Sequence, residues 1–435
     1  MSLKLMRQKD FTLLMLGKLV SLLGSNMQQF ALSLYVFALT GSTTIFASMI
    51  SISILPRILL SPIAGVFGDW FNRKKSIVLL DMINAVVLGV FAVLFLSNGG
   101  LSLLFIYILV ILLEVTEIFF SSAMSGVMPS IVKKDDLLEA NSMDSLILSI
   151  GQLIAPIIAA FLYGIFGLLV VLIINAISFF CSAISEMFIR IPKSEVKREK
   201  KNLKLFKEDL KGGFTVIKEN PFIKTVISLA TIINFCISPF FSVGLILIIK
   251  NVLKASDFQY GLYQMVISTS MIIAPILCAT FIKKIKINHV TFFSFLIIAI
   301  LILISALVPA HFILNLFKIN LIPYIFLLAI LFIMGLMVAI ANISMGTIFS
   351  KVVPIELMGR TSTVLNLFAT ICIPVGQMLF GFLFDVIHPS YVIIINGFIL
   401  IISILCFRKS LYKNEVDPTI EEESDYELQV LPDGQ

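Results

Sequence analysis

Two acidic residues, Glu114 and Glu117, interrupt an apolar stretch that runs from about residue 101 to 125. Because they are three residues apart, both carboxyl groups fall on one face of a helix. A charge near the centre of a bilayer costs about 2.5–3.5 kcal/mol on insertion scales, so acidic residues there mark functional positions. Two such neighbours cannot both ionise cheaply in a low dielectric, and one is expected to exchange protons near physiological pH. The pair is therefore a candidate proton carrier, with a static ion pair to Arg57 or Lys18 as the alternative.

The stretch that carries these glutamates is one of twelve similar ones. The chain of 435 residues is 59% hydrophobic and 13% charged, against about 45–50% and about 25% in soluble proteins. Each apolar stretch reaches the roughly 20 residues that a helix needs to cross a bilayer. The stretches lie at about 11–37, 44–67, 76–97, 101–125, 142–163, 168–189, 223–249, 259–282, 289–308, 321–349, 362–387 and 390–408. Runs such as LFIYILVILL do not alternate, which excludes a membrane barrel and predicts an all-α integral membrane fold of twelve transmembrane helices.

The distribution of basic residues predicts the orientation of these helices. Of 32 Lys and Arg residues, 27 fall in the N-terminus, the even-numbered loops and the C-terminal segment, and three in odd-numbered loops. This asymmetry predicts that both termini face the cytoplasm. The predicted parts are a six-helix half at 1–190, a basic linker at 191–222, a second six-helix half at 223–408 and an acidic, disordered tail at 409–435. For the linker, an amphipathic helix at the headgroup layer and a solvated charged segment both fit the sequence.

Further polar residues lie inside the predicted spans. In the first span, Lys18, Ser21, Ser25 and Gln28 recur at helical spacing, and such a stripe is expected to face a cavity. Polar packing between helices is the alternative for several of them. The candidate cavity residues are Lys18, Ser25, Gln28, Gln29, Arg57, Asn234 and Asn342.

The loop after the second span, GVFGDWFNRKKS at 65–76, combines glycines, one acid and three consecutive basic residues. Gly65 allows a close approach to a neighbouring helix. Asp69 ends the second span on the side where the eleventh begins, just after Gly359 and Arg360. A carboxylate beside a helix N-terminus is favoured by about 0.3–1 kcal/mol. We interpret the stretch as a latch that forms when the cytoplasmic side is closed, with Arg73 orienting Asp69 or pairing with Asp144. The alternative is that the basic residues only anchor topology.

This loop resembles the motif between spans 2 and 3 of the major facilitator superfamily, approximately G-x-L-A/G-D-R-F/Y-G-R-R/K-K/R. The matching positions are Gly65, Gly68, Asp69, Phe71, Arg73, Lys74 and Lys75, whereas Trp70 and Asn72 depart from it. Segments 119–142, 208–224 and 352–362 resemble the drug-exporter branch that contains macrolide efflux proteins and siderophore exporters.

A second resemblance lies in the fifth span. The segment GQLIAPIIAA resembles the superfamily's antiporter motif, G-x3-G-P-x2-G-G, with alanine at three glycine positions. The corresponding residues are Gly151, Ala155, Pro156, Ala159 and Ala160. Small side chains at these positions are expected to permit close contact with the eighth span.

The resemblance implies a secondary transporter of the cell membrane that exports hydrophobic or amphipathic compounds, drug-like or macrolide-like, by proton antiport through alternating access. A siderophore exporter, a lysophospholipid transporter and a membrane sensor that does not transport are the alternatives. No enzymatic activity, metal or cofactor is expected, and no G-x4-G-K-S/T loop occurs through which ATP would drive transport directly. The expected partners are a small substrate, protons and the bilayer, with no nucleic acid, for a protein acting as a monomer.

Overall fold

The computed structural model describes residues 5–70, 72–125, 127–133, 136–190, 218, 221–280, 285–317, 320–353 and 355–413, and every regular element in them is a helix. The first part contains η1 (Leu5–Arg7), α1 (Lys9–Thr40), α2 (Thr43–Trp70), α3 (Arg73–Asn98), α4 (Leu103–Met124), α5 (Met128–Ile131) and α6 (Leu137–Met187). The second contains α8 (Pro221–Pro239), the π-helical segments η3 (Phe240–Gly244) and η4 (Leu247–Val252), α9 (Asp257–Thr280), α10 (Ile287–Ser305), α11 (His311–Leu316), α12 (Leu321–Val352), α13 (Ile355–Val386) and α14 (Pro389–Lys413).

Twelve transmembrane passes follow from these helices, as the sequence predicts. Ten stretches of the described chain are long and apolar enough to cross a membrane. One of them, α6, contains two passes, because the chain turns at Gly167, whose φ of 73° favours glycine. The twelfth pass is α1, which spans 32 residues and is less apolar because it carries residues such as Asn26 and Gln29.

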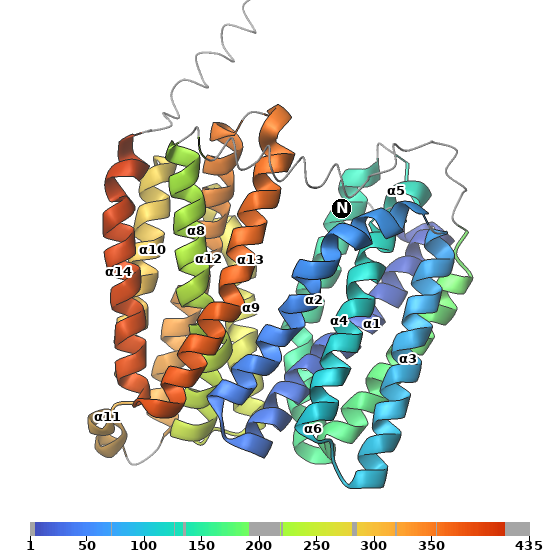
Figure 1. Ribbon diagram of the computed structural model, residues 1–435, viewed down its shortest axis with the longest axis horizontal. Helices are drawn as coiled ribbons and strands as arrows, with labels where there is room; N and C mark the ends of the chain where they lie inside the picture. The colour runs from blue at the N-terminus through green and yellow to red at the C-terminus, as the bar shows by residue number, and fades with distance from the viewer. Residues whose placement is uncertain are drawn as a thin grey trace, which may run out of the picture.

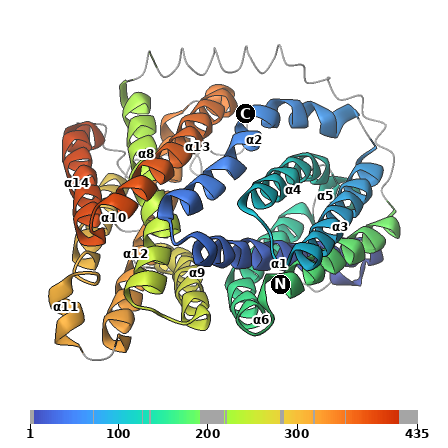
Figure 2. The ribbon, with the colours of Figure 1, turned by 60° about the horizontal axis from the view of Figure 1, so that its bottom comes forward.

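The helices form two bundles. Helices α1 to α6 pack against one another, as do α8 to α14, and the main contacts between the bundles are α2 with α13 and α6 with α9 (Figure 2). Figure 1 shows α2 and α13 meeting at the end of the molecule where α11 lies, and separating toward the end where α5 lies and α14 finishes. We call these the α11 end and the α5 end. The bundles thus touch at the α11 end and part at the α5 end.

Small residues let the helices approach closely within each bundle. At Gly24 of α1, a Cβ atom would lie 2.3 Å from Oδ1 of Asn175 on α6. At Gly335 of α12, it would lie 1.9 Å from Oγ of Ser270 on α9. A side chain at either position would displace these polar groups, so the glycines permit close helix packing.

Two parts of the predicted organisation lie outside the described residues: nearly all of the basic linker and the acidic tail from residue 414 onward. The last helix differs from its predicted end, because α14 continues through the basic residues Arg408 and Lys409 to Lys413.

Candidate functional site

The glutamates of α4 have different surroundings. Oε1 of Glu114 accepts hydrogen bonds from Nε and Nη2 of Arg57 on α2, at 2.8 and 2.6 Å. The Arg57 side chain is 57% exposed and that of Glu114 is 17% exposed. Glu117 forms no ion pair among the described residues, is exposed, and lies within electrostatic range of Glu114, Arg57 and Lys18. Glu114 therefore has the ion pair that the sequence analysis gave as an alternative, whereas Glu117 has no such pair among the described residues.

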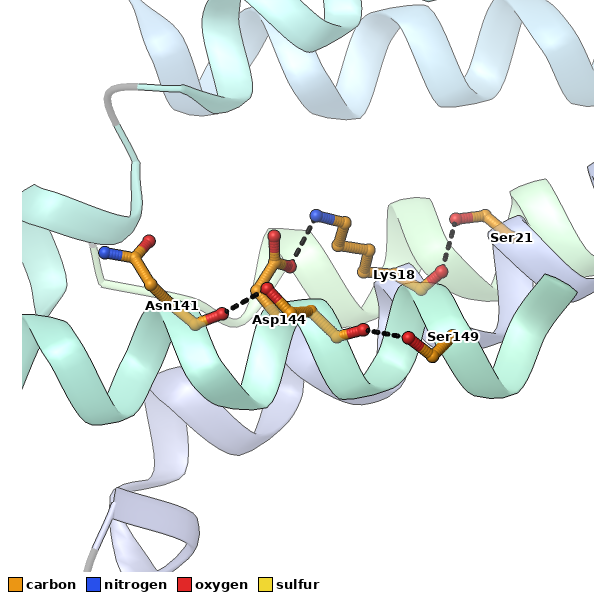
Figure 3. Close-up of polar contacts among 6 residues, drawn as sticks. Lys18, Ser21, Asn141, Asp144 and Ser149 are labelled. Atoms are coloured by element: carbon orange, nitrogen blue, oxygen red, sulfur yellow. Dashed lines mark hydrogen bonds and ion pairs between the residues drawn. The ribbon is translucent and has the colours of Figure 1, made fainter. Parts of the chain in front are cut away.

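Lys18 of α1, the other basic residue that the sequence analysis selected as a possible partner of the glutamates, forms an ion pair elsewhere. Its Nζ reaches from α1 to Oδ1 of Asp144 on α6, at 2.5 Å (Figure 3). Each side chain of this pair is 21% exposed. Among the described residues of the first bundle, one ion pair thus links α1 to α6 and another links α2 to α4.

The exposed surface of α4 has an apolar and a polar side. Leu104, Ile108 and Leu112 are exposed on one side, as expected for a surface in contact with lipid. Glu117 and Ser121 are exposed as well, but at 100° per residue they lie well away from that side. Charged side chains in a membrane face the bundle interior or water rather than lipid. The polar side of α4 is therefore suited to lining a hydrated path.

The candidate cavity residues separate into two groups. Gln29 and Asn342 are exposed, and Ser25 and Asn234 are half-buried. Gln28 differs from the prediction: it is 2% exposed, and Nδ2 of Asn175 donates a hydrogen bond to its Oε1. The stripe on α1 does not face a cavity along its whole length, because part of it packs against the polar residues of α6.

The predicted latch lies at the α5 end. Gly65 and Asp69 belong to the last turns of α2, Gly359 and Arg360 to the first turns of α13, and their side chains lie outside the described residues. Arg73 begins α3. These two ends of α2 and α13 lie apart in both views (Figures 1 and 2).

The opposite ends of the same two helices are joined by Asp385, a residue that the sequence analysis did not select. The N–H of Thr43 donates to its Oδ1 at 2.8 Å, and the N–H of Thr44 donates to its Oδ2 at 2.9 Å. The hydroxyls of Ser42 and Thr44 each donate to Oδ2 at 2.6 Å. The next N–H, that of Ile45, donates to Oγ of Ser42 at 3.2 Å. A carboxylate from the second bundle thus completes the N-terminal cap of α2 in the first.

The contact between α2 and α13 continues away from Asp385. A Cβ atom on Gly381 would lie 2.6 Å from Cβ of Ala47, so only glycine fits between the helices here. Farther along, Oγ of Ser51 donates to Oε1 of Gln377 at 3.3 Å. The α11 end is therefore closed by both hydrogen bonds and close backbone packing.

The antiporter-like segment forms the other contact between the bundles. A Cβ atom on Gly261 of α9 would lie 3.0 Å from both the Pro156 carbonyl oxygen and Cβ of Ala160. Ala155 and Ala159 are fully buried. Gly151 faces α1 instead, where a Cβ atom would lie 2.7 Å from the Leu22 side chain. Small residues of this segment thus serve packing within the first bundle as well as between the bundles.

Comparison with known proteins identifies the family. The model of the Major Facilitator Superfamily matches residues 14–373. The chain belongs to this superfamily. This major facilitator protein is therefore a multi-pass membrane transporter and not an enzyme.

Relatives and solved structures agree with this assignment. Macrolide efflux protein A of Streptococcus pyogenes is 22% identical over 391 residues, which cover 90% of this chain and 93% of that protein. In fold, the chain is similar to a bacterial homologue of the human lysosomal transporter Spinster, with a TM-score of 0.70, 13% identity and coverage of 94% and 98%. It is also similar to a bacterial homologue of the iron transporter ferroportin, with a TM-score of 0.69, 16% identity and coverage of 92% and 98%. The major facilitator fold thus extends over nearly the whole chain.

Proposed function

We propose that this transporter exports hydrophobic or amphipathic organic compounds, of which macrolides are the leading class, in exchange for protons. It would act by alternating access in the cell membrane, with both termini in the cytoplasm. The observation that carries the proposal is the arrangement of α2 and α13, which Asp385 joins at the α11 end and which separate at the α5 end. The name of the macrolide efflux relative supports the substrate class.

The proposed orientation gives this conformation a place in the transport cycle. With the α5 end in the cytoplasm, the arrangement corresponds to the state that is open to the cytoplasm. A compound would enter between the bundles, where Ser25, Gln29, Asn234 and Asn342 offer polar groups on otherwise apolar helices. The change to the outward-open state would break the Asp385 contacts. Asp69 would then meet the N-terminal end of α13, which stabilises a carboxylate through the helix dipole.

Proton coupling is assigned to Glu114 and Glu117. A proton bound at Glu114 would neutralise this carboxylate and leave the positive charge of Arg57 uncompensated. Protonation of the site would therefore change the net charge of the Arg57–Glu114 pair. Glu117 supplies a second carboxyl group on the exposed polar side of α4. In the proposed cycle both carboxyls accept protons from outside while the compound leaves, and release them to the cytoplasm before the next compound binds.

Accumulation of a radiolabelled macrolide in inside-out vesicles tests this function. We expect accumulation that requires the vesicle lumen to be more acidic than the medium and that is lost in Glu114→Gln/Glu117→Gln. Asp257→Asn provides a control, because Asp257 is an ion-paired carboxylate of the second bundle. Gradient-dependent accumulation that survives in the double variant would refute the assignment of the proton site. Binding without accumulation would favour a sensor, and movement of a lysophospholipid or siderophore in place of the macrolide would refute the substrate class.

A further inference from the structure

Two buried carboxyl groups in the first bundle have no counter-charge among the described residues. Asp81 of α3 and Glu186 of α6 are each 1% exposed and lie within electrostatic range of each other. Oδ2 of Asp81 and Oε2 of Glu186 have no hydrogen-bond partner in the part of the chain that the structure describes. In the part of the chain that the structure describes, no ion pair involves either residue. Two acids within electrostatic range of each other are therefore buried in the protein interior, and among the described residues two of their oxygen atoms are unsatisfied.

A third polar group points into the same place. Ser182, one turn before Glu186 on α6, is 1% exposed, and its side chain lies beside Asp81. Within the described part of the chain, its Oγ makes no hydrogen bond of normal geometry, so Asp81 is the polar group next to it. On the opposite helix stands Gly17, where a Cβ atom would lie 3.3 Å from this oxygen. A hydroxyl and two carboxyls thus converge at a point where α1 leaves room for them.

Apolar residues separate this group from the α5 end. Ile77 lies one turn before Asp81 on α3, and Ile189 follows Glu186. Both belong to a buried hydrophobic cluster that also contains Phe11 and Leu14 of α1. Because the cluster shields the carboxyls from the α5 end, negative charges on them would be costly.

The surrounding charges do not compensate the pair. From α4, Glu117 adds a negative charge within electrostatic range of Asp81. From α1, Lys18 is next to Gly17 but is paired with Asp144 of α6. The carboxylate of Asp10 on α1 accepts a hydrogen bond from the backbone N–H of Arg190 and adds no positive charge to the pair. The cations on α3 itself are at its start, where Arg73, Lys74 and Lys75 are half-buried or exposed.

We propose that Asp81, Glu186 and Ser182 form a second proton-binding site, in which one proton is shared between the two carboxyl groups. Burial of two neighbouring carboxylates without a cation is prohibitive, whereas a shared proton gives the pair a single negative charge and one internal hydrogen bond. The Ser182 hydroxyl can donate to the remaining carboxylate oxygen. A role in transport, which rests on the proposed function, would be to exchange this proton with Glu117 by breaking the O–H bond at the pair and forming one at Glu117.

Infrared spectroscopy of the purified protein in lipid nanodiscs tests the site without requiring transport. We expect the wild type at neutral pH to show a protonated-carboxyl C=O band that shifts in D2O and corresponds to about one group per protein. The band should decrease by that amount in Asp81→Asn/Glu186→Gln and remain in Asp257→Asn. Because the amides mimic protonated carboxyls in shape, we expect the double variant to fold; the single variants serve if it does not.

The outcomes separate this proposal from the transport function. A band that is missing in the wild type at neutral pH would overturn the site, and so would a band that is as strong in the double variant as in the wild type. A band that disappears when sodium chloride replaces choline chloride would overturn it in favour of a metal cation. A wild-type band that depends on the pair supports the site even where the protein moves no macrolide, and in that case only the antiport is refuted.

Discussion

Replacement of Asp385 offers the sharpest test of how the two bundles are held together. Its carboxylate caps α2 from α13, so the contact exists only while the α11 ends of these helices meet. In Asp385→Ala each bundle keeps its own packing, but the closed α11 end loses all the hydrogen bonds that the carboxylate accepts. The substitution should therefore shift the balance between conformations toward the state that is open at the α11 end.

The size of the shift follows from the contacts. Hydrogen bonds to a charged group contribute about 1.5–3 kcal/mol each when buried. Asp385 is exposed, however, so water replaces much of this contribution once the contact opens. What remains is comparable to the loss of a helix N-cap, about 0.5–2 kcal/mol, together with about 0.3–1 kcal/mol from the helix dipole. The total of about 1–3 kcal/mol corresponds to a roughly 5- to 150-fold change in the ratio of the two conformations.

Distances between spin labels measure this ratio directly. Leu39 at the end of α1 and Phe312 in α11 are 52% and 73% exposed, and they place one label on each bundle at the α11 end. In a background without the five native cysteines, we expect the longer-distance population to rise in Asp385→Ala and to stay unchanged in Asp257→Asn. Identical distance distributions in the wild type and Asp385→Ala would refute the role of the carboxylate as a contact that closes this end.

Three further predictions follow from the same structure. Gly381→Val should also open the α11 end, because even a Cβ atom there lies 2.6 Å from α2, whereas Gly346→Val, with no atom within 4 Å, should leave the label distances unchanged. Arg57→Gln or Glu114→Gln should each lower the free energy of unfolding by about 1 kcal/mol or less, since the arginine is largely exposed. The charge-swapped variant Arg57→Glu/Glu114→Arg should restore the stability measured by thermal unfolding. A charge-swapped variant that stays destabilised would argue against a pairwise interaction. Burial and a neighbouring histidine lower the pKa of His388, so its neutral form stabilises the fold above the ordinary pKa of about 6.5, and this contribution is lost as the pH falls through the lowered value. The melting temperature should accordingly fall less on acidification in His388→Gln than in the wild type, and parallel curves would contradict this prediction.

The transmembrane helices were predictable because their signal is local. The span predicted at 321–349 corresponds to α12 at Leu321–Val352, and the one at 44–67 corresponds to α2 at Thr43–Trp70. Each depends only on a continuous apolar segment of sufficient length. The turn at Gly167 falls in the short gap between two predicted spans, where glycine permits the backbone to reverse.

The partners of polar residues were less predictable, because they come from distant parts of the chain. The sequence analysis named Arg57 as one possible partner of Glu114, and the structure pairs them. A polar stripe on α1, in contrast, fits both a cavity and a contact between helices, and Gln28 lies in such a contact with α6. Asp385 lies near the end of a predicted span, where an acidic residue is common, so its position in the sequence gives no sign of a special role. Its partner, the Ser-Thr-Thr run at 42–44, has the pattern of a helix N-cap but does not reveal which carboxylate completes it.

The buried acids show a related difficulty. Asp81 follows a basic helix start and Glu186 precedes the basic linker, so both have the sequence pattern of residues at the membrane surface. The hydrophobic cluster between them and the α5 end combines residues of α1, α3 and α4 with Ile189, and no single segment reveals it. Burial by packing between helices therefore decides the chemistry of these positions.

Simultaneous recording of macrolide and proton movement tests the central claim most directly. Proteoliposomes loaded with a macrolide would be diluted into substrate-free buffer, with a pH-sensitive dye enclosed in the lumen. Proton antiport predicts that macrolide efflux acidifies the lumen, and that both signals are absent in protein-free liposomes. Macrolide efflux without a change in luminal pH, or with alkalinisation, would contradict the account.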